Sequence, residues 1–140
     1  MCWFIAYREN KIAVSESFDY SLYKKVNVLG ENNYNFSTHE VDIEGKKYFS
    51  ITHNLCACDF FTANSSKPSC LRLAPLREEF QQFILDRMEY PCIEPTIITK
   101  WDCGHEEFTT ESIKKVKLNI SEINKILENE EECIYRVVRA

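Results

Sequence analysis

"APLREEFQQFILDRMEY", residues 74–90, decides the fold, because it is the clearest amphipathic helix in the chain. Pro75 suits the first helical turn, and Pro91 stops the helix. A helix with one apolar face has to bury that face against another element, and the rest of the sequence has to supply it. The apolar residues recur at intervals of three and four: Leu76, Phe80, Phe83, Ile84 and Met88.

Residues 38–53, "THEVDIEGKKYFSITH", predict a β-hairpin before this helix. Apolar and polar residues alternate up to a break at Glu44-Gly45, and a β-prone segment follows the break. A two-residue loop at this position places Asp42 opposite Lys47, which is a favourable pair of charges on neighbouring strands.

Several further segments are rich in β-branched, aromatic or other apolar residues and predict strands. The first of them, "CWFIAY", is followed by "RENK", which we expect to turn the chain into a short second strand. "CACDFF" is interpreted as a buried β segment, because free cysteine often serves as a small core residue. These segments span residues 2–7, 12–15, 56–61, 96–101 and 132–138.

Residues 110–130 fit two patterns. The spacing of Ile113, Val116, Ile120 and Leu127 is typical of one long helix, whereas the residues from 114 to 120 alternate like a strand. We prefer a strand at 114–120, with Ser121 as the N-cap of a helix at 122–129. The predicted fold is α+β: one domain over residues 1–140, with a largely antiparallel sheet and two helices packed on one face.

The composition is that of a globular domain, with 44% hydrophobic and 28% charged residues and a net charge of -5. No apolar run approaches the ~20 residues of a membrane helix, and the first residues do not form a signal peptide, so we expect a cytoplasmic protein. The charge and the lack of basic runs argue against nucleic acids and anionic membranes as partners. A basic protein is the partner that the charge favours.

Seven cysteines without regular spacing predict free thiols in a reducing compartment rather than disulfides. Most are expected to fill the core, and no cofactor is required. Two closely spaced pairs could nevertheless hold zinc, whose ligands are thiolates and neutral imidazoles. The four candidate ligands are Cys56, Cys58, Cys103 and His105.

Common nucleotide-binding loops are excluded, because the only glycines are Gly30, Gly45 and Gly104. "MCWFIAYR", residues 1–8, is similar to the start of class II glutamine amidotransferases, in which removal of Met leaves a nucleophilic cysteine. That family continues with a His-Thr-Arg stretch and an Asn-Gly pair, and this chain has neither. We therefore expect Cys2 to be an ordinary strand residue, and an enzyme would have to use a thiol or carboxylate outside known motifs.

What remains is a small acidic domain whose expected role is to bind another protein, for example as a stoichiometric inhibitor or a toxin-immunity protein. Acidic residues would steer a basic partner, and an aromatic residue would contribute affinity. Trp101 is the main aromatic candidate, with Tyr90 and Phe108 as further ones. The acidic candidates are Asp102, Glu106, Glu107, Glu128, Glu130, Glu131 and Glu132.

Overall fold

The computed structural model of the chain describes residues 2–11, 34–63, 66–102 and 109–139. Within these residues, six strands form one mixed sheet in the order β2-β3-β1-β4-β6-β5. All neighbouring strands are antiparallel except β5 and β6, which are parallel, so the expected α+β class is confirmed. The strands are β1 (Cys2–Lys11), β2 (Ser37–Ile43), β3 (Lys46–Thr52), β4 (Ile93–Asp102), β5 (Lys114–Asn119) and β6 (Cys133–Val138).

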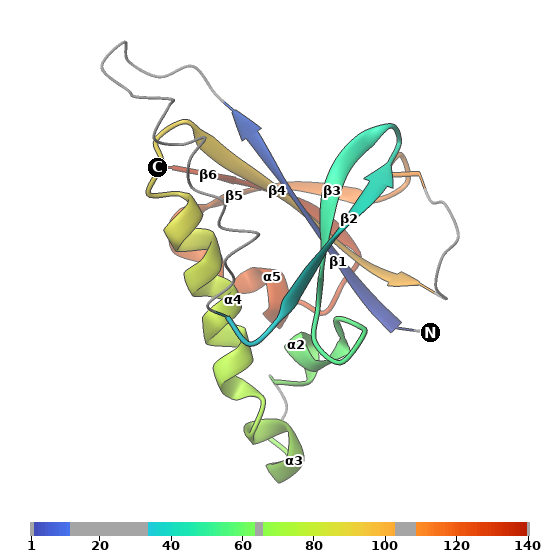
Figure 1. The fold of residues 1–140 in the computed structure, drawn as a ribbon, viewed down its shortest axis with the longest axis vertical. Coiled ribbons are helices and arrows are strands. Elements are labelled where there is room, and N and C mark those ends of the chain that lie inside the picture. The colour runs from blue at the N-terminus through green and yellow to red at the C-terminus, as the bar shows by residue number, and fades with distance from the viewer. Residues whose placement is uncertain (1, 12–33, 64–65, 103–108, 140) are drawn as a thin grey trace.

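The longest described helix is α4 (Ala74–Arg87), which confirms the helix predicted from the apolar stripe and runs beside the twisted sheet in Figure 1. The expected arrangement of two helices is not confirmed, because short helices that were not predicted come before α4. None of the helices in the described residues is long and apolar enough to cross a membrane. The shorter helical elements are α2 (Cys58–Thr62), α3 (Pro68–Leu71), the 3-10 turn η1 (Ile120–Glu122) and α5 (Lys125–Glu128).

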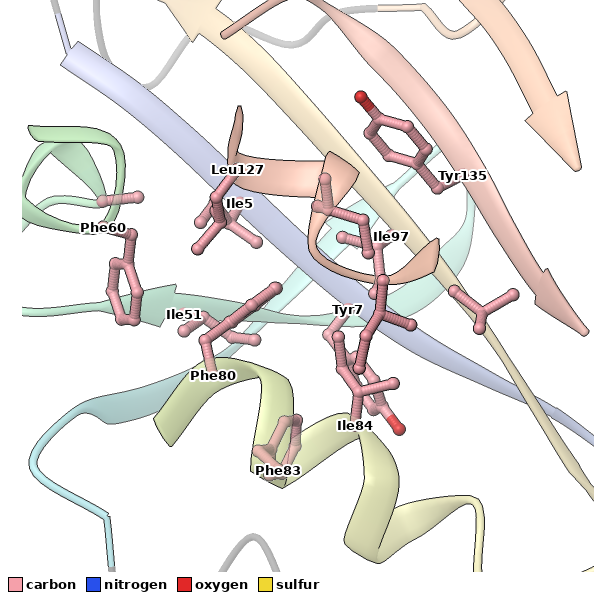
Figure 2. Packing of buried hydrophobic residues seen from close by; sticks show 14 of the residues in the cluster. Ile5, Tyr7, Ile51, Phe60, Phe80, Phe83, Ile84, Ile97, Leu127 and Tyr135 are labelled. Carbon is pink, nitrogen blue, oxygen red and sulfur yellow. The ribbon is translucent and has the colours of Figure 1, made fainter. Parts of the chain in front are cut away.

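The main core lies between the helices and one face of the sheet. β1 contributes Ile5 and Tyr7 to this core, whereas Ala6 between them belongs to a smaller cluster on the opposite face, as the alternation of a strand requires. Figure 2 shows Phe80 and Phe83 of α4 in this core, close to the strands. The same cluster contains residues of α2 and α5, so the helices share one apolar interior with the sheet.

A buried polar network fastens the second half of β1 to α4. Arg87 Nη2 donates a hydrogen bond to Glu9 Oε2 at 2.8 Å, and Arg87 Nε donates to Glu9 Oε1. The Tyr7 hydroxyl donates to Glu9 Oε1 at 2.9 Å, and burial is the main reason why the pKa of Tyr7 is raised well above its usual value. Only 5% of the Arg87 side chain and 12% of the Glu9 side chain are exposed.

This network explains one incorrect prediction. "RENK" does not turn the chain: β1 continues to Lys11, which pairs with Ile93 at the start of β4. The polar residues are accommodated in the strand because their side chains find partners there: Glu9 binds Arg87, and Asn10 Nδ2 donates to Thr96 Oγ1 at 2.5 Å. The expected strand at 12–15 lies outside the described residues.

The hairpin predicted at 38–53 is confirmed, with Asp42 paired with Lys47 in the register of β2 and β3. Glu44 and Gly45 both have positive φ, 52° and 77°, which matches the type I′ turn of a two-residue hairpin loop. The ion pair, however, forms diagonally: Lys47 Nζ lies 3.1 Å from Glu40 Oε1.

In the ambiguous segment, β5 confirms the predicted strand. The helix expected at 122–129 is wrong in extent, because η1 and the four-residue α5 take its place. The cap is also two residues earlier: the Asn119 side chain accepts a hydrogen bond from Ser121 N at 2.9 Å, so Ser121 is the capped residue and not the cap.

Candidate metal centre

The candidate site begins with a tight turn between β3 and α2. His53 N donates to Cys56 O at 2.8 Å, and Cys56 N donates to His53 O at 3.4 Å. The two residues between them, Asn54 and Leu55, have φ values of 53° and 72°, so the turn is of type I′. Asn tolerates this conformation well, but Leu does so only at a cost in free energy.

This geometry corrects the interpretation of "CACDFF" as a β segment. The chain turns at Asn54 and Leu55, just before Cys56, and α2 begins at Cys58, from which Phe60 and Phe61 are both buried in the core. His53 and Cys56 are therefore partners across a turn.

The turn is docked against the start of β1 through Trp3. Ala57 N donates to Trp3 O at 3.2 Å, and Trp3 N donates to Cys58 Sγ at 3.3 Å. The Trp3 ring stacks on Phe61 with 4.4 Å between ring centroids. These contacts bring Cys58 next to the residue that follows Cys2, although the two segments are more than fifty positions apart in the sequence.

Three thiols meet at this junction. The Sγ atoms of Cys2, Cys56 and Cys58 all lie within 4.8 Å of one another; Cys2 is exposed and the other two are half-buried. Sulfurs bound to one tetrahedral Zn²⁺ at ~2.3 Å are about 3.8 Å apart, so small side-chain movements would bring all three into its coordination shell. The group can therefore supply three ligands to a thiophilic metal ion.

The surroundings of Cys58 favour its neutral thiol until a cation binds. Burial, followed by hydrogen bonds with Cys56 and Cys2, raises the pKa of Cys58 to about 11, while the Trp3 N–H acts in the opposite direction. A bound metal ion would displace the thiol proton, and the Trp3 N–H would then stabilise the thiolate charge on Cys58.

A second hydrogen-bonded pair holds the turn in place. His53 Nδ1 lies 2.6 Å from Asp59 Oδ2, and both side chains are about one quarter exposed, at 25% and 26%. The contact joins the first residue of the turn to the first turn of α2, on either side of Cys56 and Cys58. His53 thus has a partner, and it also lines an open pocket with Arg72 and Glu79.

The described residues thus bring together two of the four predicted metal ligands, Cys56 and Cys58. Cys103 and His105 lie outside the described residues. Cys2, which we expected to be an ordinary strand residue, does lie in a strand but also joins the thiol group. Sequence reasoning missed it because the contact depends on β1 docking against the turn, for which the only local signal is the β-prone start of the chain.

The predicted protein-binding residues that the structure describes differ in their exposure and in their contacts. Trp101 is 40% exposed and contacts Trp3 edge to face, while Glu130 is exposed. Asp102 pairs with Cys2 in the sheet register, and Glu106 and Glu107 lie outside the described residues. The remaining three acids form ion pairs within the chain: Glu128 with Arg77, Glu131 with Lys114 at 3.6 Å, and Glu132 with Lys100 at 3.0 Å.

Comparison with known proteins identifies no family for this chain. No family model, curated protein or solved structure matches the chain. The function has to be argued from the chemistry of the thiol group and the contacts that hold it.

Proposed function

We propose that this protein is a metal-binding domain that holds a thiophilic ion, in the first place Zn²⁺, at Cys2, Cys56 and Cys58. The observation that carries the proposal is the meeting of three sulfurs from two distant segments within 4.8 Å. Scattered core cysteines have no reason to converge in this way, and the other described cysteines, Cys70, Cys92 and Cys133, do not belong to the group.

The bound ion would fasten the start of β1 to the turn that precedes α2. Three thiolates leave one position of a tetrahedral zinc site for water or another ligand. Cys103 and His105, which the sequence predicts as ligands, remain candidates for that position. The proposal includes the reducing cytoplasm expected from the sequence, because thiols must stay reduced to bind the ion.

The test is the metal content of protein purified without chelator, measured by native mass spectrometry together with elemental analysis. We expect about one zinc ion per wild-type chain and a loss of most of this zinc in Cys2→Ser and Cys58→Ser. Cys2→Ser should disturb the fold less than Cys58→Ser, because Cys2 is exposed. Cys70→Ser is the matched control that should retain the metal.

Wild-type protein without metal, which also fails to take up added zinc under reducing conditions, would contradict the proposal. Equal metal content in the wild type, Cys2→Ser and Cys58→Ser would place the ion elsewhere. The variants Cys103→Ser and His105→Ala, measured in the same way, test whether either residue completes the coordination shell.

Protein binding is a second candidate function, supported by two exposed apolar side chains. Leu55 is 97% exposed in a conformation that leucine rarely adopts, and Trp101 is 40% exposed. A stoichiometric inhibitor or immunity protein would use such residues as anchors. A partner that binds the wild-type chain but not Leu55→Asp or Trp101→Ala would support this role, and unchanged binding with both variants and with Glu130→Lys would contradict it.

A further inference from the structure

Among the described cysteines, Cys2 is the only one that is exposed. Cys92 and Cys133 are fully buried, and Cys70 lies in α3, away from the group. Cys2 is exposed at the start of β1, and its sulfur is within 4.8 Å of two other sulfurs. A small oxidant in solution would therefore meet Cys2 first and find potential disulfide partners next to it.

The backbone contacts favour Cys58 as the partner of Cys2. Trp3 N donates to Cys58 Sγ at 3.3 Å, which fixes this sulfur beside the residue that follows Cys2. The Cys58 thiol interacts with the thiols of both Cys56 and Cys2, so the backbone contacts distinguish between the two partners. Because Ala57 N is bonded to Trp3 O, the backbones that carry the two cysteines are already held together without a disulfide.

The alternative disulfide between Cys56 and Cys58 is disfavoured by the residue between them. Ala57 is only 1% exposed, and its N–H is bonded to Trp3 O. Closing a ring that contains this single residue would change the backbone of Ala57 and remove it from the core, because disulfide geometry is narrow.

We propose that the metal site is redox-regulated: oxidation of Cys2 and Cys58 to a disulfide by a low-molecular-weight disulfide such as glutathione disulfide releases the ion. This inference rests on the proposed function. The step is a thiol–disulfide exchange: the two cysteine thiolates lose one electron pair and form the new S–S bond, and the S–S bond of glutathione disulfide breaks and takes up that pair. Two glutathione thiolates form, and Zn²⁺ leaves because only one of the three thiolates still holds it.

The experiment treats zinc-loaded protein with glutathione disulfide and follows zinc release with a chromogenic chelator. Mass spectrometry of the same samples counts thiols and maps disulfides. We expect loss of one zinc ion per chain together with a Cys2–Cys58 disulfide and a mass decrease of about 2 Da for the two hydrogens of the metal-free thiols. Dithiothreitol should restore zinc binding, and Cys70→Ser should respond as the wild type does.

Two variants test the pairing without depending on the metal. Cys56→Ser keeps both predicted partners and should still form the Cys2–Cys58 disulfide. Cys58→Ser should instead stop at a mixed disulfide between Cys2 and glutathione. A Cys56–Cys58 disulfide in the wild type would overturn the pairing.

The two proposals fail in different ways. Zinc that stays bound, with all thiols resistant to glutathione disulfide over hours, would overturn the redox inference and leave the metal-binding function intact. A protein that never binds zinc would contradict the proposed function, whether or not the Cys2–Cys58 disulfide forms.

Discussion

The two ends of β1 differ in how their polar groups are satisfied. Toward the end of the strand, Glu9 accepts hydrogen bonds from Arg87 and Tyr7, so buried charges of opposite sign meet inside the chain. At the start, Cys2 meets two other thiols, which offer one another only weak hydrogen bonds. A buried pair of opposite charges indicates a structural role, whereas converging soft ligands indicate a site for a ligand that the chain itself does not supply.

The largest expected effect lies at the end of β1 that carries the buried Glu9–Arg87 pair. Glu9→Ala leaves the buried Arg87 charge without its carboxylate and should lower the free energy of unfolding by about 3–5 kcal/mol, measured by urea denaturation. The double variant Glu9→Ala/Arg87→Met should recover part of this loss, and zinc content should not change in either protein. A loss of less than about 1 kcal/mol would show that the pair behaves like an exposed salt bridge.

The next effect concerns the start of β1 and depends on metal. At a free zinc concentration of about one hundred times Kd, binding should stabilise the wild type by about 2.7 kcal/mol. Cys58→Ser should lose this zinc-dependent increment, whereas Cys70→Ser should keep it. Thermal unfolding with zinc and with chelator provides the measurement. An equal response to zinc in the wild type and Cys58→Ser would contradict a metal site at the start of β1.

A smaller effect is expected from the pair that holds the turn. Asp59→Asn removes the carboxylate that binds His53 Nδ1 without touching a thiol, and it should weaken zinc binding about tenfold, in the range found when groups supporting a metal ligand are changed. Competition with a chromophoric chelator measures the affinity. His53→Ala should have a similar effect, and the two changes together should add little. Unchanged affinity would mean that the turn keeps its shape without this contact.

The smallest expected effect is a gain in stability. Leu55→Gly relieves a positive φ of 72° and removes no packing, since Leu55 is 97% exposed, but it also makes the unfolded chain more flexible. The relief of backbone strain should outweigh the greater flexibility of the unfolded chain, and the free energy of unfolding should rise by at most about 1 kcal/mol. A clear loss of stability would show that the leucine side chain has a contact that its exposure does not suggest.

The elements whose signals are local could be predicted from the sequence. The stripe that starts at Leu76 required a helix, and Glu44-Gly45 required a hairpin turn, because spacing and turn chemistry are properties of neighbouring residues. Two failures had non-local causes: Arg87 keeps "RENK" in a strand from 78 residues away from Glu9, and the buried rings of Phe60 and Phe61 lie on a helix that begins at Cys58, within "CACDFF".

The candidate site could be predicted only in part for the same reason. Cys56 and Cys58 are close in sequence, so a shared ligand was conceivable from their spacing. The contact with Cys2 arises from two hydrogen bonds between Trp3 and the 57–58 backbone and side chain, and it depends on how β1 docks in the completed sheet. No short stretch of sequence contains that information.

The central claim is that the converging sulfurs bind a metal ion, and X-ray absorption at the zinc edge tests it most directly. For wild-type protein loaded with one equivalent of zinc, we predict a shell of at least three sulfur atoms at about 2.3 Å, and one sulfur fewer in Cys2→Ser. A shell made only of nitrogen and oxygen atoms, or the same number of sulfurs in both proteins, would contradict the proposed site.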